Sequence, residues 1–251
     1  MLQYRYDSTF EGFLCAVAHC LAEGEEPELF LRGSEEPAYQ LLFDEVTVDI
    51  PTDLQAALEF RQSFVEAASR QVFASARYAF HSQQTGVELL LWRYFKLGLR
   101  VGQRLVHMLA DSDVNAVDRI SRSVAHQAHK YLGFVRFREV EQGFLYARIE
   151  PQYDILCFIA PHFATRVGDR PWVIHDLSRS QAAVYDLKKW RLVRDVELSG
   201  TPDFTAAEQE CALLWRRYFD RLAIEARRNL RLQRQHVPMH SRRHMVEFTD
   251  L

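Results

Sequence analysis

Five polar side chains in the second half of the chain interrupt stretches that are otherwise apolar. They are His162, Arg166, His175, Asp176 and Arg179. Burying a polar group without a hydrogen-bond partner costs free energy, so we expect these side chains to pair or to face a cleft. His162 and Arg166 are four residues apart and would project from one side of a helix, whereas His175 and Asp176 end an apolar segment.

Three interpretations of this group stay open. In the first, Arg166 and Arg179 hold a phosphate and a histidine donates a hydrogen bond to it. In the second, the group is catalytic, with His162, His175 and Asp176 as candidates. A histidine titrates near neutrality and can act as a general base when an acid orients it. In the third, the same groups form a structural network that ties a sheet to its helix.

Arginines elsewhere in this half suggest contacts with a nucleic-acid backbone. Arg136, Arg138 and Arg148 alternate with apolar and aromatic residues in segments 134–139 and 144–149, so one face of a hairpin could present guanidinium groups beside rings. An amphipathic sheet with a solvated face gives the same pattern.

The C-terminal stretch 227–243 holds six arginines and no acid. Arg228, Arg231 and Arg234 are its candidates for phosphate contacts, which would make affinity fall with salt. The alternatives are a tail that neutralises the acidic first part of the chain, or simple solvation.

Charge is divided unevenly along the 251 residues. The net charge is −3, but residues 1–66 carry −11 and the remainder carries +8. Of the 31 basic residues, 27 are arginine, whose planar guanidinium suits bidentate contact with phosphate or carboxylate. A GC-rich genome with acidic and basic halves docked together would explain the same numbers. The division therefore raises a nucleic-acid hypothesis and proves none.

Several classes of protein are excluded or disfavoured. With 48% apolar and 26% charged residues the composition is globular rather than disordered. No apolar run is long enough to span a bilayer, and the start lacks a secretory signal, so we expect a cytoplasmic protein with no membrane partner. The four cysteines form no C-x-x-C pair, and His126 and His129 lack further ligands. We predict free thiols, no metal site and no cofactor.

The periodicity predicts an α+β fold in two domains. Residues 1–125 form a mainly helical domain, with helices over 10–22, 53–82, 85–102 and 114–131. Residues 126–251 form an α+β domain whose antiparallel sheet is flanked by helices. Its elements are a hairpin at 134–149, a short helix at 161–167, strands at 172–175, 182–186 and 190–196, and a long helix after Thr205. The apolar face of that helix is Cys211, Leu214, Trp215, Tyr218 and Leu222. Beyond Asn229 we expect an extended chain.

Five phrases of the sequence resemble the bacterial family called probable DNA metabolism protein. They are 6–14 (YDSTFEGFL), 129–139 (HKYLGFVRFRE), 160–166 (APHFATR), 172–179 (WVIHDLSR) and 229–238 (NLRLQRQHVP). The resemblance covers nearly the whole chain and is strongest from residue 126 onward, where a domain of unknown function is recognised. Similar domains occur fused to a uracil-DNA glycosylase domain or beside a radical SAM protein assigned to DNA repair or modification. The resemblance implies a role in DNA metabolism and supplies no catalytic residues.

These observations lead to one main hypothesis and two rivals. The main hypothesis is a protein that binds DNA or a nucleotide through its C-terminal domain, as an accessory to a repair or modification enzyme such as a radical SAM protein. The acidic N-terminal part would contact that enzyme. The first rival is an enzyme acting on nucleic acid through His162 or His175 with Asp176. The second is a scaffold that binds only proteins.

Overall fold

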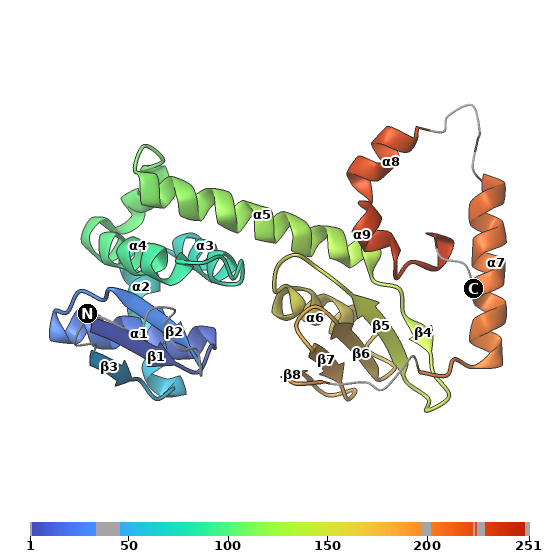
Figure 1. The fold of residues 1–251 in the computed structure, drawn as a ribbon, viewed down its shortest axis with the longest axis horizontal. Coiled ribbons are helices and arrows are strands. Elements are labelled where there is room, and N and C mark those ends of the chain that lie inside the picture. Colours follow the sequence, from blue (N-terminus) through green and yellow to red (C-terminus); the bar gives the residue numbers. More distant parts are fainter. Residues whose placement is uncertain (1, 34–45, 197–201, 223, 225–228, 249–251) are drawn as a thin grey trace. The chain divides into compact units, whose positions relative to one another are not determined.

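The computed structural model describes residues 2–33, 46–196, 202–222, 224 and 229–248. The chain divides into two compact units, Met1–Ala125 and His126–Leu251, and each is described by itself (Figure 1). The architecture is α+β, as predicted, with helices and a sheet in each unit. Among the described residues, no helix is both long and apolar enough to cross a bilayer.

The first unit contains a three-stranded sheet of order β2-β1-β3. Its strands are β1 (Leu2–Tyr6), β2 (Leu29–Arg32) and β3 (Val46–Asp49), and both outer strands run parallel to β1. A parallel pair needs a crossover connection, and helix α1 (Phe10–Glu23) supplies it between β1 and β2. Thr9 caps this helix by accepting a hydrogen bond from the Gly12 N–H, and the left-handed Gly24 ends it.

The helices that follow are α2 (Leu54–Ala67), α3 (Arg70–Phe80), α4 (Val87–Val101) and α5 (Ser112–Phe134), with a 3-10 turn η1 (Gly102–His107) before α5. The prediction of one helix over 53–82 was wrong, because the backbone is extended at Ser69. The Ser69 hydroxyl accepts a hydrogen bond from the Val72 N–H and starts α3 as a separate helix.

Aromatic side chains fill the core of this unit. Phe64 and Phe95 meet edge to face with ring centroids 4.8 Å apart, and Phe13 stacks on Phe80 at 5.4 Å. All four are buried. Such pairs add to the hydrophobic stabilisation that burial of the rings provides.

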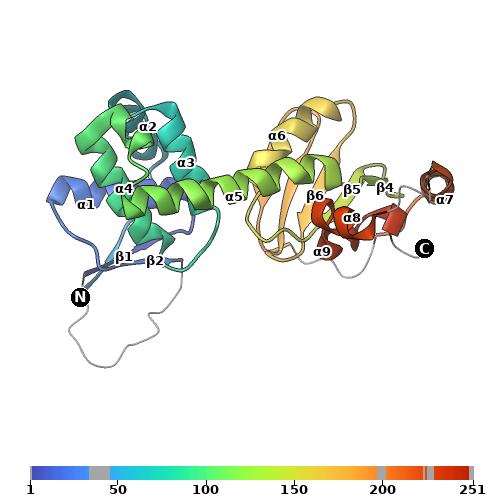
Figure 2. The ribbon, with the colours of Figure 1, turned by 90° about the horizontal axis from the view of Figure 1, so that it is seen from above.

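The second unit contains a five-stranded sheet of order β4-β5-β6-β7-β8. The strands are β4 (Arg138–Glu139), β5 (Leu145–Ile149), β6 (Trp172–Asp176), β7 (Gln181–Tyr185) and β8 (Trp190–Val193). The sheet is mostly antiparallel, as predicted, but β5 and β6 run parallel. The crossover between them is helix α6 (Leu156–Arg166), which lies along one face of the sheet in Figure 2.

Two predicted elements at this sheet differ in the structure. The first arm of the hairpin is only two residues long, because Phe134 is the last residue of α5. Helix α6 begins at Leu156 and contains Pro161, so the apolar stretch 155–160 belongs to the helix that we expected only from 161.

The C-terminal part is helical rather than extended. Helix α7 (Ala206–Leu222) is followed by α8 (Leu230–His236), α9 (Met239–Arg242) and the 3-10 turn η3 (Val246–Phe248). Asn229 caps α8, because its side chain accepts a hydrogen bond from the Leu232 N–H. The prediction of an extended chain beyond Asn229 did not take this cap into account. The free thiols of Cys15, Cys20 and Cys157 are buried, whereas Cys211 is exposed on α7.

Candidate functional site

The parallel pair β5 and β6 brings polar side chains together at one edge of the second sheet. The register places Arg148 opposite His175 and Ile149 opposite Asp176, at the last residues of both strands. The carboxyl ends of parallel strands are where open α/β sheets bind ligands. This edge therefore has the placement of a site, and its chemistry depends on how each polar group is engaged.

His175 is 3% exposed and shares a hydrogen bond with a tyrosine of the neighbouring strand. The Tyr146 hydroxyl lies 2.9 Å from His175 Nδ1. Burial lowers the pKa of His175, and the nearby Arg148 charge lowers it further. Burial also raises the pKa of Tyr146. Both side chains are therefore neutral at neutral pH. Tyr146 engages Nδ1 of the buried His175 ring, whereas Nε2 is buried without a hydrogen-bond partner among the described residues.

Asp176 is fully buried, and Arg179 is its ionic partner. Arg179 Nη1 donates to Asp176 Oδ2 over 3.0 Å, and the Ser178 N–H donates to Oδ1 over 3.0 Å. Burial raises the pKa of Asp176 to about 6, because the loss of hydration outweighs the attraction of Arg179 and the Ser178 N–H.

The Arg179 guanidinium also joins two loops. It donates to the carbonyl oxygens of Pro151, at 3.0 Å, and of Gln152, at 2.6 Å. Those residues follow β5, whereas Arg179 follows β6. The Arg179 side chain thus links the chain segments that follow the two parallel strands. These contacts favour the interpretation of this group as a structural network.

The structure does not align the three catalytic candidates. Successive residues of a strand point to opposite faces of the sheet, so Asp176 does not orient His175, although the two are neighbours in the sequence. Tyr146 contacts His175 instead. His162 is exposed on α6 and packs edge to face against Phe163. Among the three interpretations left open by the sequence, the general-base arrangement therefore lacks the contact between Asp176 and His175 that it requires.

Further groups, not predicted from the sequence, reach this edge from other elements. Burial raises the pKa of Tyr131, on α5, to about 12. His244 Nε2 lies 3.4 Å from a carboxylate oxygen of Glu150, which directly follows β5. Burial lowers the pKa of His244. No short sequence pattern predicts that these residues contact the sheet, because each comes from a distant part of the chain.

Arg136 and Arg138 do not form the predicted guanidinium face. Arg136 Nη2 donates to Glu247 Oε1 at 2.6 Å, and Arg138 Nε lies 3.4 Å from Glu208 Oε1. The Arg138 guanidinium also lies over the Phe204 ring, 3.6 Å from its centroid. Arg136 lies between α5 and β4, outside any strand, so the alternation that would have placed the arginines on one face does not form.

The other predicted binding residues are distributed differently. Arg166 is exposed at the end of α6, and Arg231 and Arg234 are exposed on α8. Arg228 lies outside the described residues. Their role in binding an anion stays a prediction.

Helix α7 exposes an aromatic pair that belongs to its predicted apolar face. Trp215 is 45% exposed and Tyr218 is 55% exposed, and the two rings stack with centroids 5.7 Å apart. Leu214 and Leu222 beside them are also exposed. The sequence carries a signal for this pair in the order Trp215-Arg-Arg-Tyr218, where two rings three residues apart flank two arginines.

Another side of α7 packs against η3. Arg216 Nη2 donates to the Val246 carbonyl at 3.2 Å, and the Phe219 and Phe248 rings meet edge to face at 5.6 Å. These contacts anchor the helix to the C-terminal segment. Trp215 Nε1 also donates to Glu247 Oε2 over 3.4 Å, while Trp215 and Tyr218 stay 45% and 55% exposed.

Comparisons with known proteins identify one family. No curated protein and no solved structure gives a match. The family described as a domain of unknown function, DUF4130, matches residues 85–247. The match begins before α4, inside the first unit, rather than at residue 126. It covers α4, α5, the five-stranded sheet and the exposed helices α7 and α8, so the chain belongs to the DUF4130 family.

Proposed function

We propose that this protein binds single-stranded DNA through helices α7 and α8, as an accessory protein in DNA repair or modification. The observation that carries the proposal is the exposed, stacked pair of Trp215 and Tyr218. Aromatic side chains that bind single strands offer a flat face to unpaired bases, and each stacked base contributes about 1–3 kcal/mol.

Guanidinium groups accompany the rings. Arg217 and Arg221 are exposed on α7, and Arg231 and Arg234 are exposed on α8. The segment 229–243 contains no acid that could neutralise the arginines of α8 locally. Arginine donates bidentate hydrogen bonds to phosphate, so these positions can follow a nucleic-acid backbone while the rings hold bases.

Single strands are favoured over duplex for a geometric reason. The bases of a duplex are stacked on one another and hidden from a side chain that approaches from outside, whereas the bases of a single strand are free to stack on Trp215 and Tyr218. An account based on arginines alone predicts no such preference, since both forms carry phosphates. The preference therefore separates the two accounts.

The accessory role rests on the charge division and on the resemblance to DNA metabolism proteins. Residues 1–66 carry a charge of −11 and would repel a phosphate backbone. They are the part of the chain suited to contact a basic surface on a partner enzyme, such as a radical SAM protein or a uracil-DNA glycosylase domain. Binding to such a partner should weaken as salt rises.

The test is fluorescence anisotropy of the full chain with labelled oligonucleotides, single-stranded and duplex, at about 50 and 200 mM salt. We expect tighter binding to the single strand and a steep loss of affinity with salt. Tyr218→Ala should weaken single-strand binding by about 10-fold, corresponding to the loss of one stacked base.

The double variant Lys188→Ala/Lys189→Ala is the control, because it removes two exposed charges at the turn between β7 and β8. It should leave single-strand affinity within about twofold. Salt-insensitive binding, or equal losses in Tyr218→Ala and in the control, would contradict the proposal.

A further inference from the structure

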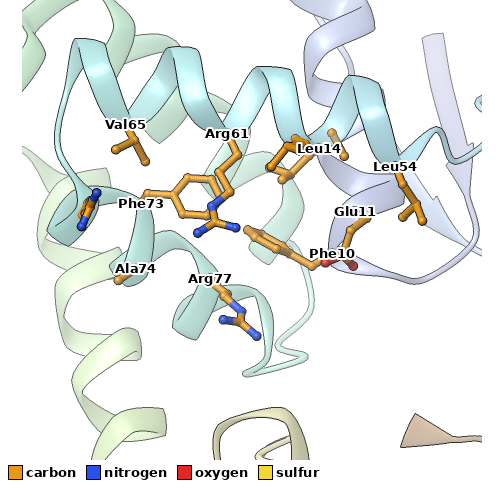
Figure 3. Close-up of a pocket in the computed structure, with 12 residues that line it drawn as sticks. Phe10, Glu11, Leu14, Leu54, Arg61, Val65, Phe73, Ala74 and Arg77 are labelled. Carbon is orange, nitrogen blue, oxygen red and sulfur yellow. The ribbon is translucent and has the colours of Figure 1, made fainter. Parts of the chain in front are cut away.

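A pocket in the first unit opens between helices α1, α2 and α3, and its volume is about 450 Å³. Figure 3 shows the side chains that line it. Binding sites for small organic molecules have volumes of roughly 300–1,000 Å³, with mostly apolar walls and a few placed polar groups. The pocket lies entirely within residues 10–77, so its geometry depends on one unit alone.

The base of the pocket is apolar and aromatic. Phe10 and Leu14 come from α1, Ala57 from α2 and Phe73 from α3, and all four are buried. The Phe10 and Phe73 rings lie 5.7 Å apart, between centroids. A flat aromatic group entering the pocket would therefore meet two phenyl rings.

Three arginines line the same pocket. Arg61 comes from α2, and Arg70 and Arg77 come from α3, seven residues apart and thus on the same side of the helix. The Arg61 guanidinium lies over the Phe73 ring, 5.8 Å from its centroid (Figure 3). Glu11 is the acid among the residues that line the pocket. Residues 1–66 are otherwise strongly acidic, with Arg61 as one of three bases, so this concentration of positive charge is local.

The lining defines the chemistry of a ligand. Three guanidinium groups against one carboxylate favour a ligand with more than one negative charge, and their planar forks match phosphate oxygens. Phenyl rings beneath them favour a flat aromatic body, over which the Arg61 guanidinium could also stack. The Glu11 carboxylate can accept a hydrogen bond from a sugar hydroxyl or an exocyclic amine.

We propose that this pocket binds a nucleoside phosphate, with the base against Phe10 and Phe73 and the phosphates against the arginines. The site is separate from the DNA surface proposed on α7 and α8, which belongs to the second unit. It gives the protein a small-molecule ligand in addition to a polymer. Either proposal can fail while the other holds.

The test is isothermal titration calorimetry of the full chain with ADP, AMP, adenosine and pyrophosphate. We expect ADP to bind more tightly than AMP, and both to bind more tightly than adenosine or pyrophosphate alone. The double variant Arg61→Ala/Arg70→Ala should weaken ADP binding at least 10-fold. Arg100→Ala removes an exposed arginine of α4 that does not line the pocket, and it should leave ADP affinity within twofold.

A second pair of variants tests the pocket without removing charge. Ala74 lines the pocket on α3, so Ala74→Trp should fill it and abolish ADP binding. Gln71→Trp adds the same side chain at an exposed position of α3 outside the lining, and it should bind ADP normally. Circular dichroism of each variant establishes that the helices are intact.

Three outcomes would overturn the proposal. One is no heat of binding with ADP or AMP at millimolar concentration. Another is an equal loss of ADP affinity in Arg61→Ala/Arg70→Ala and in Arg100→Ala. The third is tight binding of an aliphatic carboxylate such as laurate with no binding of ADP, which would show a pocket for an acyl chain. None of these results bears on single-stranded DNA binding at α7.

Discussion

Two sets of arginines in the second unit differ in whether a carboxylate pairs with them. At the sheet, Arg136, Arg138 and Arg179 each pair with a carboxylate, namely Glu247, Glu208 and Asp176 in that order. On the C-terminal helices, the exposed arginines are Arg217, Arg221, Arg231 and Arg234, and no ion pair among the described residues involves them. The first set holds the unit together, and the second is accessible to a ligand.

The difference shows that the number of arginines does not measure the capacity to bind an anion. The three acids that engage the sheet arginines all belong to the second unit, so neutralisation is internal to that unit. A guanidinium already bonded to a carboxylate has fewer donors left for phosphate. The local supply of carboxylates therefore decides which arginines are available.

The strongest test of this comparison is Arg179→Ala. It leaves Asp176 buried without its ionic partner, and removing one member of a buried ion pair costs about 3–5 kcal/mol. We expect that loss in the free energy of unfolding measured by urea denaturation at pH 7.

Arg166→Ala is the matched control, because Arg166 is exposed at the end of α6. Its free energy of unfolding should stay within about 0.5 kcal/mol of the wild type. Equal effects of the two substitutions would contradict the division into paired and available arginines.

The second prediction concerns the pH dependence of the same pair. Since the folded pKa of Asp176 is about 6, above the ordinary aspartate value of 3.8, its contribution to stability is greatest below about pH 4. That contribution falls as pH rises through 6. In Asp176→Asn the side chain does not titrate, so the free energy of unfolding of the variant relative to wild type should rise by about 2 kcal/mol from pH 4 to 7, at about 1.4 kcal/mol per pKa unit.

Urea denaturation of both proteins at pH 4, 5, 6 and 7 measures this difference. His175 and His244 are present in both proteins, so to first order their titration cancels from the comparison. A difference that stays constant with pH would show that Asp176 is ionised throughout the range and that Arg179 outweighs the effect of burial.

The sequence predicted those elements whose signals are local. The strands near 172–175 and 182–186 carry their apolar pattern within five residues, and α7 begins where the Thr205 hydroxyl accepts a hydrogen bond from the Glu208 N–H. The parallel pairing of β5 and β6 was missed, because Pro161 disguised the length of the crossover helix α6. The direction of a strand depends on that connection and not on its own residues.

The polar residues at the end of the sheet were also predicted only in part, because only some of their contacts are local in the sequence. His175, Asp176 and Arg179 are close in the sequence, and the last two do contact each other. Tyr146 and His244 belong to other segments, so nothing near His175 in the sequence indicates them. The alternation of a strand also separates His175 from Asp176, which adjacency in the sequence conceals.

The third prediction applies to the exposed arginines. Arg231→Ala/Arg234→Ala removes two potential phosphate contacts from α8, so the slope of log affinity against log salt for single-stranded DNA should decrease in magnitude by about 1.4, or 0.7 per contact. The free energy of unfolding should change by less than about 0.5 kcal/mol. Anisotropy titrations at several salt concentrations measure the slope. An unchanged slope together with the full affinity would place the DNA contacts elsewhere.

The smallest effect is expected for Tyr146→Phe, which removes the hydroxyl that contacts His175 in the sheet. Because His175 loses a buried hydrogen-bond partner, the free energy of unfolding at pH 7 should fall by about 1 kcal/mol. Tyr218→Phe removes an exposed hydroxyl but keeps the stacking ring, and should change stability by much less. Both variants should bind single-stranded DNA like the wild type. If Tyr146→Phe lowered DNA affinity, the end of the sheet would belong to the binding site, and the two sets of arginines would no longer have separate roles.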